Sequence, residues 1–195
     1  FYNDNRKEFA NSIKKIMPYK RLNIDLAVGG EPTPHLESDL NPDRNFLNLA
    51  YGYSSNITAL QLLTFYNAIA NNGTMVKPIF CSEIKEGEKT IKTIRPEVIN
   101  EEICSARTLK IIQSMLEGVV ENGSARRLSK TPYGIAGKTG TSQINYTQKN
   151  KTHMTYRASF AGYFPADNPK YSCIVVITNP KKNKQHGGEI AAPVF

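Results

Sequence analysis

The sequence has no tryptophan, only three cysteines and no hydrophobic run long enough to cross a membrane. The apolar run Cys173–Ile177 is far too short to span a bilayer, and no signal peptide opens the chain. The cysteines are far apart in the sequence and show neither a CxxC nor a Cys/His spacing. The sequence therefore predicts neither a zinc site nor a disulfide framework.

Basic residues outnumber acidic ones, which gives a formal net charge of +8. A basic protein can bind nucleic acid when its lysines and arginines are dense and are interleaved with aromatic residues. Here the basic residues are scattered along the chain. We therefore expect no nucleic-acid partner.

The length of 195 residues, with 39% hydrophobic content, is sufficient for one sizeable hydrophobic core. We expect residues 1–195 to form one portion of a single domain. The chain begins with Phe1 rather than methionine, and we expect it to be part of a longer protein whose membrane anchor lies outside it.

Three segments have the spacing of amphipathic helices. In residues 8–16 the apolar positions recur at helical spacing, and Pro18 ends the pattern. Residues 58–73 begin with a potential N-cap at Thr58, place Leu62, Phe65 and Ile69 on one face, and end at a glycine. Residues 105–121 carry a similar apolar stripe and are followed by Asn-Gly.

The remaining segments favour loops and strands. Prolines and glycines predict an irregular connection over residues 26–48. Residues 75–94 alternate around Gly87, which predicts a β-hairpin. Strands are predicted over residues 134–142, 155–163 and 171–178, with the last two antiparallel. Helices that precede a run of strands indicate an α+β fold.

The segment "YGIAGKTGTSQ" surrounds one lysine with small residues. On a strand, Lys138 and Gly140 share one face, and Thr139 and Thr141 share the other. Glycine within a strand often marks a place where a ligand or another backbone approaches closely. A Lys-Thr-Gly triplet alone is also compatible with a solvated lysine on an edge strand.

Longer stretches carry a family resemblance. "GIAGKTGTSQ" followed by "RASFAGYFPADNPKYSCIVVITNP" resembles the third catalytic motif and following strands of penicillin-binding protein transpeptidase domains, specifically class B enzymes of cell division. Upstream, "AYGYSSNITALQLLTFYNAIANNGTMVKPIF" is similar to another segment of that family, and "MLEGVVENGSARRL" and "GGEIAAPVF" resemble its later helices. The resemblance covers nearly the whole chain and implies a penicillin-binding/serine β-lactamase-like fold. It also implies an antiparallel sheet flanked by helices and incomplete on its N-terminal side.

The family also has an S-x-x-K motif with the nucleophilic serine and a second serine motif. "SIKK" at Ser12, "SEIK" at Ser82 and "SSN" at residues 54–56 match these patterns formally. A nucleophilic serine needs its hydroxyl at the start of a helix, one turn from its lysine. Ser12 falls inside a polar helix and Ser82 in a hairpin, so we expect the true serine motifs to precede Phe1 and this segment alone to be inactive.

The resemblance implies roles for the lysine strand. Lys138 would supply positive potential, the hydroxyls of Thr139 and Thr141 would bind the terminal carboxylate of substrate, and Gly140 would keep the strand clear. Ser142 would also contact substrate. The backbone N–H of Thr141 would be one donor of the oxyanion hole.

The resemblance further implies the setting of the complete protein. Its substrates would be peptidoglycan stem peptides ending in D-Ala-D-Ala, its inhibitors β-lactams, and its partners cell-division proteins. No cofactor or metal is expected. The domain would lie on the periplasmic side of the bacterial inner membrane.

Two alternatives remain open. The chain could be a non-catalytic scaffold that keeps the fold without the nucleophile, or it could belong to a serine β-lactamase or β-lactam sensor, which shares the lysine motif. His35, His153 and His186 are far apart in polar surroundings, so we expect them to be surface residues.

Overall fold

The computed structural model describes residues 6–24, 30–36, 48–53, 55–144, 154–181 and 184–195. The chain divides into two compact units. Unit 1 comprises Phe1–Ala68 and Gly73–Cys104, and unit 2 comprises Ile69–Asn72 and Ser105–Phe195.

Unit 1 begins with helix α1 (Arg6–Ile16), which confirms the first predicted helix. Its apolar face packs into a small core in which Ala10, Leu36 and Leu49 are buried. Leu36 belongs to β1 (His35–Leu36), which pairs antiparallel with β2 (Ser55–Asn56). A short strand therefore lies within the segment predicted to be irregular, while most of that segment lies outside the described residues.

Helix α3 (Ala59–Ala70) has the predicted ends. The Oγ1 atom of Thr58 accepts a hydrogen bond from the N–H of Gln61 at 3.1 Å. Gly73, with a φ of 90°, donates its N–H to the carbonyl of Ala68 at 2.8 Å. Both termini therefore have the backbone partners that the capping pattern predicts.

The predicted buried face of α3 is only partly correct. Ile69 is buried, but Leu62 and Phe65 are only half-buried. Buried in their place are two polar residues, Gln61 and Thr64. A buried polar side chain must be hydrogen-bonded, and Gln61 meets this requirement by donating to Glu31, which hydrophobic periodicity does not reveal.

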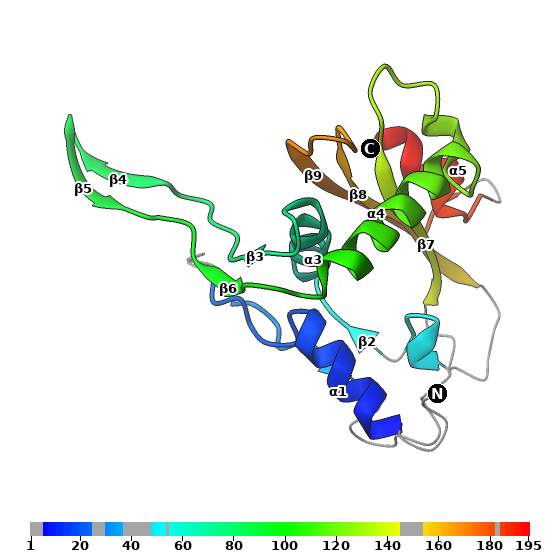
Figure 1. The fold of residues 1–195 in the computed structure, drawn as a ribbon, viewed down its shortest axis with the longest axis horizontal. Helices are drawn as coiled ribbons and strands as arrows, with labels where there is room; N and C mark the ends of the chain where they lie inside the picture. The colour runs from blue at the N-terminus through cyan, green and yellow to red at the C-terminus, as the bar shows by residue number, and fades with distance from the viewer. Residues whose placement is uncertain (1–5, 25–29, 37–47, 54, 145–153, 182–183) are drawn as a thin grey trace. The chain divides into compact units, whose positions relative to one another are not determined.

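The other strands described in unit 1 form short antiparallel pairs. β3 (Met75–Val76) pairs with β6 (Val98–Asn100), and β4 (Glu83–Glu86) pairs with β5 (Lys89–Thr93). The hairpin is therefore confirmed around Gly87 but is shorter than predicted, because Met75 and Val76 pair elsewhere. Figure 1 shows β4 and β5 as a two-stranded arm that continues beyond β3 and β6.

Unit 2 contains helix α4 (Ala106–Glu121), which confirms the third predicted helix. Ser105 caps it, since its Oγ accepts from the N–H of Thr108 at 3.3 Å. The buried positions of α4 are Leu109, Leu116 and Val120. The short 3₁₀ helix η2 (Arg126–Leu128) follows.

The centre of unit 2 is a three-stranded antiparallel sheet in the order β7-β8-β9. The strands are β7 (Ala136–Ile144), β8 (Thr155–Phe164) and β9 (Tyr171–Thr178), so all three strand predictions are confirmed within two residues at each end. β7 and β8 stay in register from the pair Ala136–Tyr163 to the pair Ile144–Thr155. Among the described residues, β7 and β9 form the two edges of this sheet.

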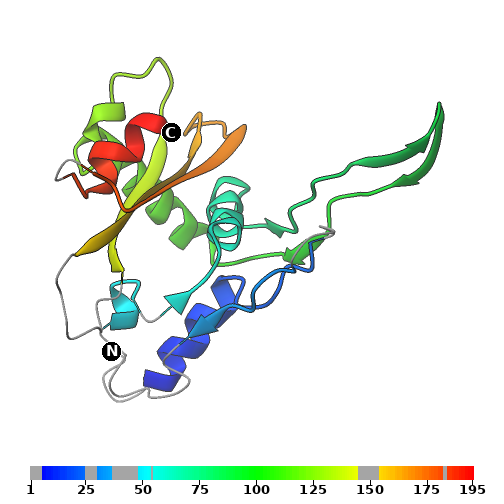
Figure 2. The same ribbon diagram turned by 180° about the vertical axis from the view of Figure 1, so that it is seen from behind.

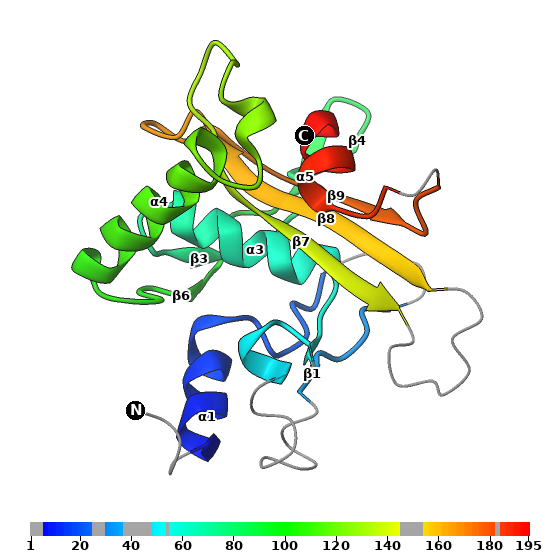
Figure 3. The same cartoon turned by 90° about the vertical axis from the view of Figure 1, so that its right-hand side faces the viewer.

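Two helices cover the sheet. α4 contacts β7, and α5 (Gly187–Ile190), followed by the 3₁₀ helix η3 (Ala192–Val194), contacts β7 and β8. Figures 2 and 3 show α4 and α5 on opposite sides of the sheet. Phe160 is fully buried in a cluster with Ala191 and Ala192, so the layered α+β architecture is confirmed.

Candidate functional site

The lysine motif lies on β7, the edge strand of the unit 2 sheet. Lys138 is exposed, and its Nζ donates a hydrogen bond to the carbonyl of Thr139 at 2.9 Å. The outer edge of β7 has no neighbouring strand among the described residues. An edge strand presents unpaired backbone N–H and C=O groups, to which an extended peptide can add by hydrogen bonding.

The two threonine hydroxyls of β7 each have a partner outside the strand. The Oγ1 atom of Thr139 lies 2.7 Å from the Oγ atom of Ser124, which follows α4. The Oγ1 atom of Thr141 accepts a hydrogen bond from the backbone N–H of Gly187, at the start of α5, at 3.2 Å. Both hydroxyls are therefore fixed in position by segments that pack against the strand.

Glycines allow this close packing. A Cβ atom added to Gly187 would overlap the backbone oxygen of Ser159 on β8, and one added to Gly188 would overlap the backbone oxygen of Ser124. At Gly140 an added Cβ atom would lie 2.5 Å from the Oγ of Ser159. Because real Cβ atoms almost never come so close to other atoms, a larger residue at Gly187 would push α5 away from β8, and one at Gly188 would push α5 away from Ser124. At Gly140 the Ser159 hydroxyl would have to move.

Ser142 lies two residues beyond Gly140 on the same strand and pairs with Arg157 of β8. It is half-buried. The structure thus places Lys138, Thr139, Gly140, Thr141 and Ser142 together on one continuous strand, as the sequence predicts. It adds Ser124 and Gly187 as their partners, which lie 15 and 46 residues from their threonines.

Burial raises the pKa of the Tyr163 phenol to about 12, and the nearby carboxylate of Glu117 contributes in the same direction. Tyr163 lies on β8 opposite Ala136, at the start of the motif strand. Its side chain is fully buried, and its hydroxyl has no hydrogen-bond partner in the described part of the structure. The sheet beneath the motif is therefore tightly packed at this position.

The serines that match the other motifs have unsuitable surroundings. Ser12 lies in the middle of α1 and donates its hydroxyl to the carbonyl of Glu8 at 2.8 Å. Ser82 is exposed and precedes β4. Ser55 hydrogen-bonds to Tyr19 at 2.7 Å, while Ser54 lies outside the described residues.

Other candidate groups give no further site. His35 and His186 are exposed, and His153 lies outside the described residues. The three cysteines are free. In the described ranges, no group of three or more His, Cys, Asp or Glu side chains could hold a metal ion. No described helix has the length and apolar character that a membrane span requires.

The family model described as penicillin binding protein transpeptidase domain matches residues 8–195. Penicillin-binding protein PbpB of Mycobacterium tuberculosis is 35% identical over 161 residues, which cover 77% of this chain and 23% of that protein. Peptidoglycan D,D-transpeptidase FtsI of Buchnera aphidicola is 33% identical over 154 residues, which cover 78% of this chain and 26% of that protein. The chain thus spans about a quarter of the length of these relatives.

Solved structures agree with this assignment. Penicillin binding protein 3 of Mycobacterium tuberculosis in its apo form superposes with a TM-score of 0.78 at 29% identity, over 97% of this chain and 44% of that chain. The same protein complexed with aztreonam superposes with a TM-score of 0.73 at 27% identity, over 89% of this chain and 40% of that chain.

Proposed function

The chain belongs to the penicillin-binding protein transpeptidase family, and from this we propose that it forms the C-terminal part of a peptidoglycan D,D-transpeptidase. The complete enzyme would cross-link stem peptides through a serine acyl-enzyme. The observation that carries this proposal is the arrangement of β7, where a Lys-Thr-Gly-Thr segment lies on a sheet edge that no described strand covers, with both threonine hydroxyls fixed in place.

The stem peptide would bind along the outer edge of β7. An extended D-Ala-D-Ala terminus would add to the strand by main-chain hydrogen bonds, antiparallel to β7. Gly140 leaves the strand without a side chain at the point of closest approach, and Ser142 continues the contact toward the end of the strand. A β-lactam would use the same edge, as the aztreonam complex of the similar protein supports.

The substrate carboxylate would bind to the hydroxyls of Thr139 and Thr141, while Lys138, on the other face of the strand, would contribute positive potential. Because Thr141 Oγ1 accepts a hydrogen bond from Gly187, the proton of Thr141 remains available to an anion. When Ser124 donates to Thr139, the proton of Thr139 is available in the same way. Hydrogen bonds to a carboxylate are charge-assisted, and Lys138 adds positive potential beside them.

Ser124 acts as a positioning residue in this scheme, since it orients the Thr139 hydroxyl without contacting substrate itself. The backbone N–H of Thr141 would be one oxyanion donor, and the N–H of the nucleophilic serine would be the other. Loss of one such donor typically costs about 3 to 4 kcal/mol of transition-state stabilisation.

The nucleophile and second serine motif would lie upstream of Phe1. This assignment is supported by the mid-helix position of Ser12, whose hydroxyl is engaged by Glu8, and by the fraction of the relatives that the chain covers. The 195-residue chain alone should therefore form no covalent adduct with a fluorescent penicillin. A labelled band that disappears in Ser12→Ala would overturn this assignment.

Acylation kinetics of the full-length protein test the role of β7. Thr139→Val keeps the β-branched shape and removes the hydroxyl, so acylation by penicillin should slow about ten- to a hundredfold. Lys138→Ala should slow it further, because it removes a full positive charge beside the carboxylate rather than one hydroxyl. Ser124→Ala should cost about fivefold, the value of one neutral hydrogen bond.

Matched controls come from the exposed strand β5, where Thr90→Val and Lys89→Ala should leave the rate unchanged. Acylation rates close to wild type in both Lys138→Ala and Thr139→Val would contradict the proposed role of the strand. Rapid release of the acyl group would identify a β-lactamase, and a complete lack of acylation in the wild-type protein would identify a scaffold.

In the cell, the complete protein would be anchored in the inner membrane, face the periplasm and work with cell-division proteins.

A further inference from the structure

Unit 1 contains a pocket of about 390 Å³ that has no part in the lysine strand. Its walls come from the end of α1 and the loop that follows, from β3 and from β6. Ligand sites in proteins have volumes of roughly 300–1,000 Å³ and are predominantly apolar with a few polar groups. In size this pocket resembles such a site, but most of its lining residues are polar or charged, and the apolar ones form a smaller part of it.

The pocket is held open by contacts between its walls. The amide Nδ2 of Asn100 donates to the carbonyl of Lys15 at 3.1 Å, which joins β6 to the end of α1. The backbone N–H of Lys77 donates to the carbonyl of Glu97 at 2.8 Å, which joins the segments after β3 and before β6. Leu22 and Met75 are 6% and 3% exposed, so the apolar floor is well packed.

The charges that line the pocket are strongly unbalanced. Glu97 is the only acid among the lining residues, and its Oε2 lies 3.8 Å from the Nζ of Lys77. Since the Glu97 side chain is 65% exposed, this ion pair is weak. The lining cations are Lys14, Lys15, Lys20, Arg21 and Lys77.

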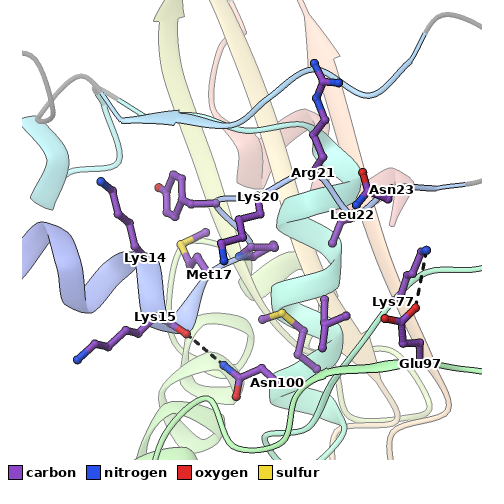
Figure 4. Close-up of a pocket in the computed structure, with 14 residues that line it drawn as sticks. Lys14, Lys15, Met17, Lys20, Arg21, Leu22, Asn23, Lys77, Glu97 and Asn100 are labelled. Atoms are coloured by element: carbon purple, nitrogen blue, oxygen red, sulfur yellow. Dashed lines mark hydrogen bonds and ion pairs between the residues drawn. The ribbon is translucent and has the colours of Figure 1, made fainter.

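The close-up shows how these groups are arranged (Figure 4). Lys20 extends over the middle of the pocket beside Met17, whereas Arg21 points away at the rim, where its Nε donates to Thr33 at 2.9 Å. Lys77 and Glu97 stand together on the opposite wall. A single ammonium group thus faces an apolar floor, with further positive charge around the rim.

We propose that this pocket binds an amphipathic anion, namely a phosphate group carried on an apolar stem. The anionic group would lie against Lys20, whose ammonium acts as a point charge for phosphate, and the excess of cations over acids among the lining residues adds positive potential. The stem would cover Met17, Leu22, Met75 and Ile99. Neither part of such a ligand would bind as well alone, because each would leave one kind of wall without a partner.

Calorimetric titration of the full-length protein with octyl phosphate tests this site. Octyl phosphate should bind at least about tenfold more tightly than inorganic phosphate and than 1-octanol, since only it satisfies both walls. Lys20→Gln should weaken its binding about tenfold, and Ile99→Ser should weaken it to a smaller extent. Lys20 is exposed and Ile99 is 40% exposed, so both variants should fold normally.

Two controls separate the site from general surface charge. Lys20→Arg keeps the charge and should bind almost as well as the wild type, and Lys130→Gln removes an exposed lysine in unit 2 and should have no effect. Equal weakening in Lys20→Gln and Lys130→Gln would overturn the proposal, as would octyl phosphate that binds no better than inorganic phosphate. The outcome is independent of the acylation rates, because no variant touches β7.

Vesicles distinguish the source of the anion. If the natural ligand is a bilayer lipid, phosphatidylglycerol vesicles should compete with octyl phosphate, and phosphatidylcholine vesicles should not. If it is a soluble metabolite, neither vesicle should compete while octyl phosphate still binds. Competition that persists unchanged in Lys20→Gln would show a diffuse surface effect and would refute the pocket as the binding site.

Discussion

The β7–β9 sheet of unit 2 and the β4–β5 hairpin of unit 1 are made in the same way, from consecutive antiparallel strands, yet only the sheet contains buried side chains. Phe160 and Tyr163 are 0% exposed on β8, whereas every residue of β4 and β5 is exposed. The difference is the cover that α4 and α5 provide to the sheet. Strand pairing satisfies backbone hydrogen bonds, but a core requires a second layer.

This difference supports placing the proposed substrate site on the sheet and not on the hairpin. A substrate-binding group must be held within a fraction of an ångström, which a strand with packed neighbours achieves and an isolated hairpin does not. Thr139 and Thr141 receive their hydrogen-bond partners from the elements that cover the sheet. The hairpin has no such cover among the described residues, and changes there should have little effect on the rest of the domain.

The largest effect should follow from separating α5 from the sheet. Gly187→Ala would push a methyl group into the backbone oxygen of Ser159 on β8, and we expect it to lower the free energy of unfolding by about 3 kcal/mol. The matched change Gly87→Ala in the hairpin has open space around it and only the strain of a φ of 60°. It should cost about 1 kcal/mol.

Both variants are compared in the full-length protein by the urea concentration at which fluorescent-penicillin labelling is half lost. This signal reports on the domain that binds penicillin. Equal midpoints for the two variants would mean that α5 does not pack on the sheet as tightly as the geometry indicates.

Sequence patterns predicted the elements well, because hydrophobic periodicity and capping residues act locally. The ends of α3 and α4 follow from Thr58, Gly73 and Ser105. The buried face of α3 could not be predicted, since Gln61 is buried through a hydrogen bond to Glu31, 30 residues away. Local patterns contain no information about such a distant partner.

The candidate site was likewise predictable only in part. The motif on β7 was predictable from its residues and from the family resemblance, and the structure places all five residues on one strand. Ser124 and Gly187 were not predicted as its partners, because their contacts with Thr139 and Thr141 depend on how distant segments pack. The only sequence signal for this packing was the presence of small residues within "ENGSARRL" and "GGEI".

An effect of intermediate size on the free energy of unfolding should appear at alkaline pH. The pKa of Tyr163 is about 12 in the folded chain, against 10.0 for a free phenol. A folded pKa above the unfolded one means that stability is fully present below pH 10 and is lost as the pH rises toward 12. At pH 11 the loss amounts to about 1.4 kcal/mol, which Tyr163→Phe should abolish.

Urea unfolding followed by circular dichroism at pH 8 and pH 11 measures this difference. At pH 8 Tyr163→Phe should be neutral or slightly stabilising, because it removes a buried hydroxyl without a described partner. Tyr51→Phe is the control, since Tyr51 is 80% exposed. An alkaline loss that is the same in wild type and Tyr163→Phe would show that this phenol ionises normally in the folded state.

The smallest effect should come from one methyl group removed from the hairpin. Ile91 is 58% exposed on β5, whereas Ile135, directly before β7, is 5% exposed. Ile135→Val deletes a methylene from the core and should cost about 1 kcal/mol, through lost burial and the cavity that remains. Ile91→Val deletes the same group from a surface that water already reaches and should change the free energy of unfolding by less than about 0.5 kcal/mol. Valine and isoleucine are both β-branched and suit a strand equally, so the two substitutions differ only in burial. The urea midpoints of penicillin labelling compare them directly, and a cost at Ile91 as large as at Ile135 would show that the hairpin arm is covered in the full-length protein.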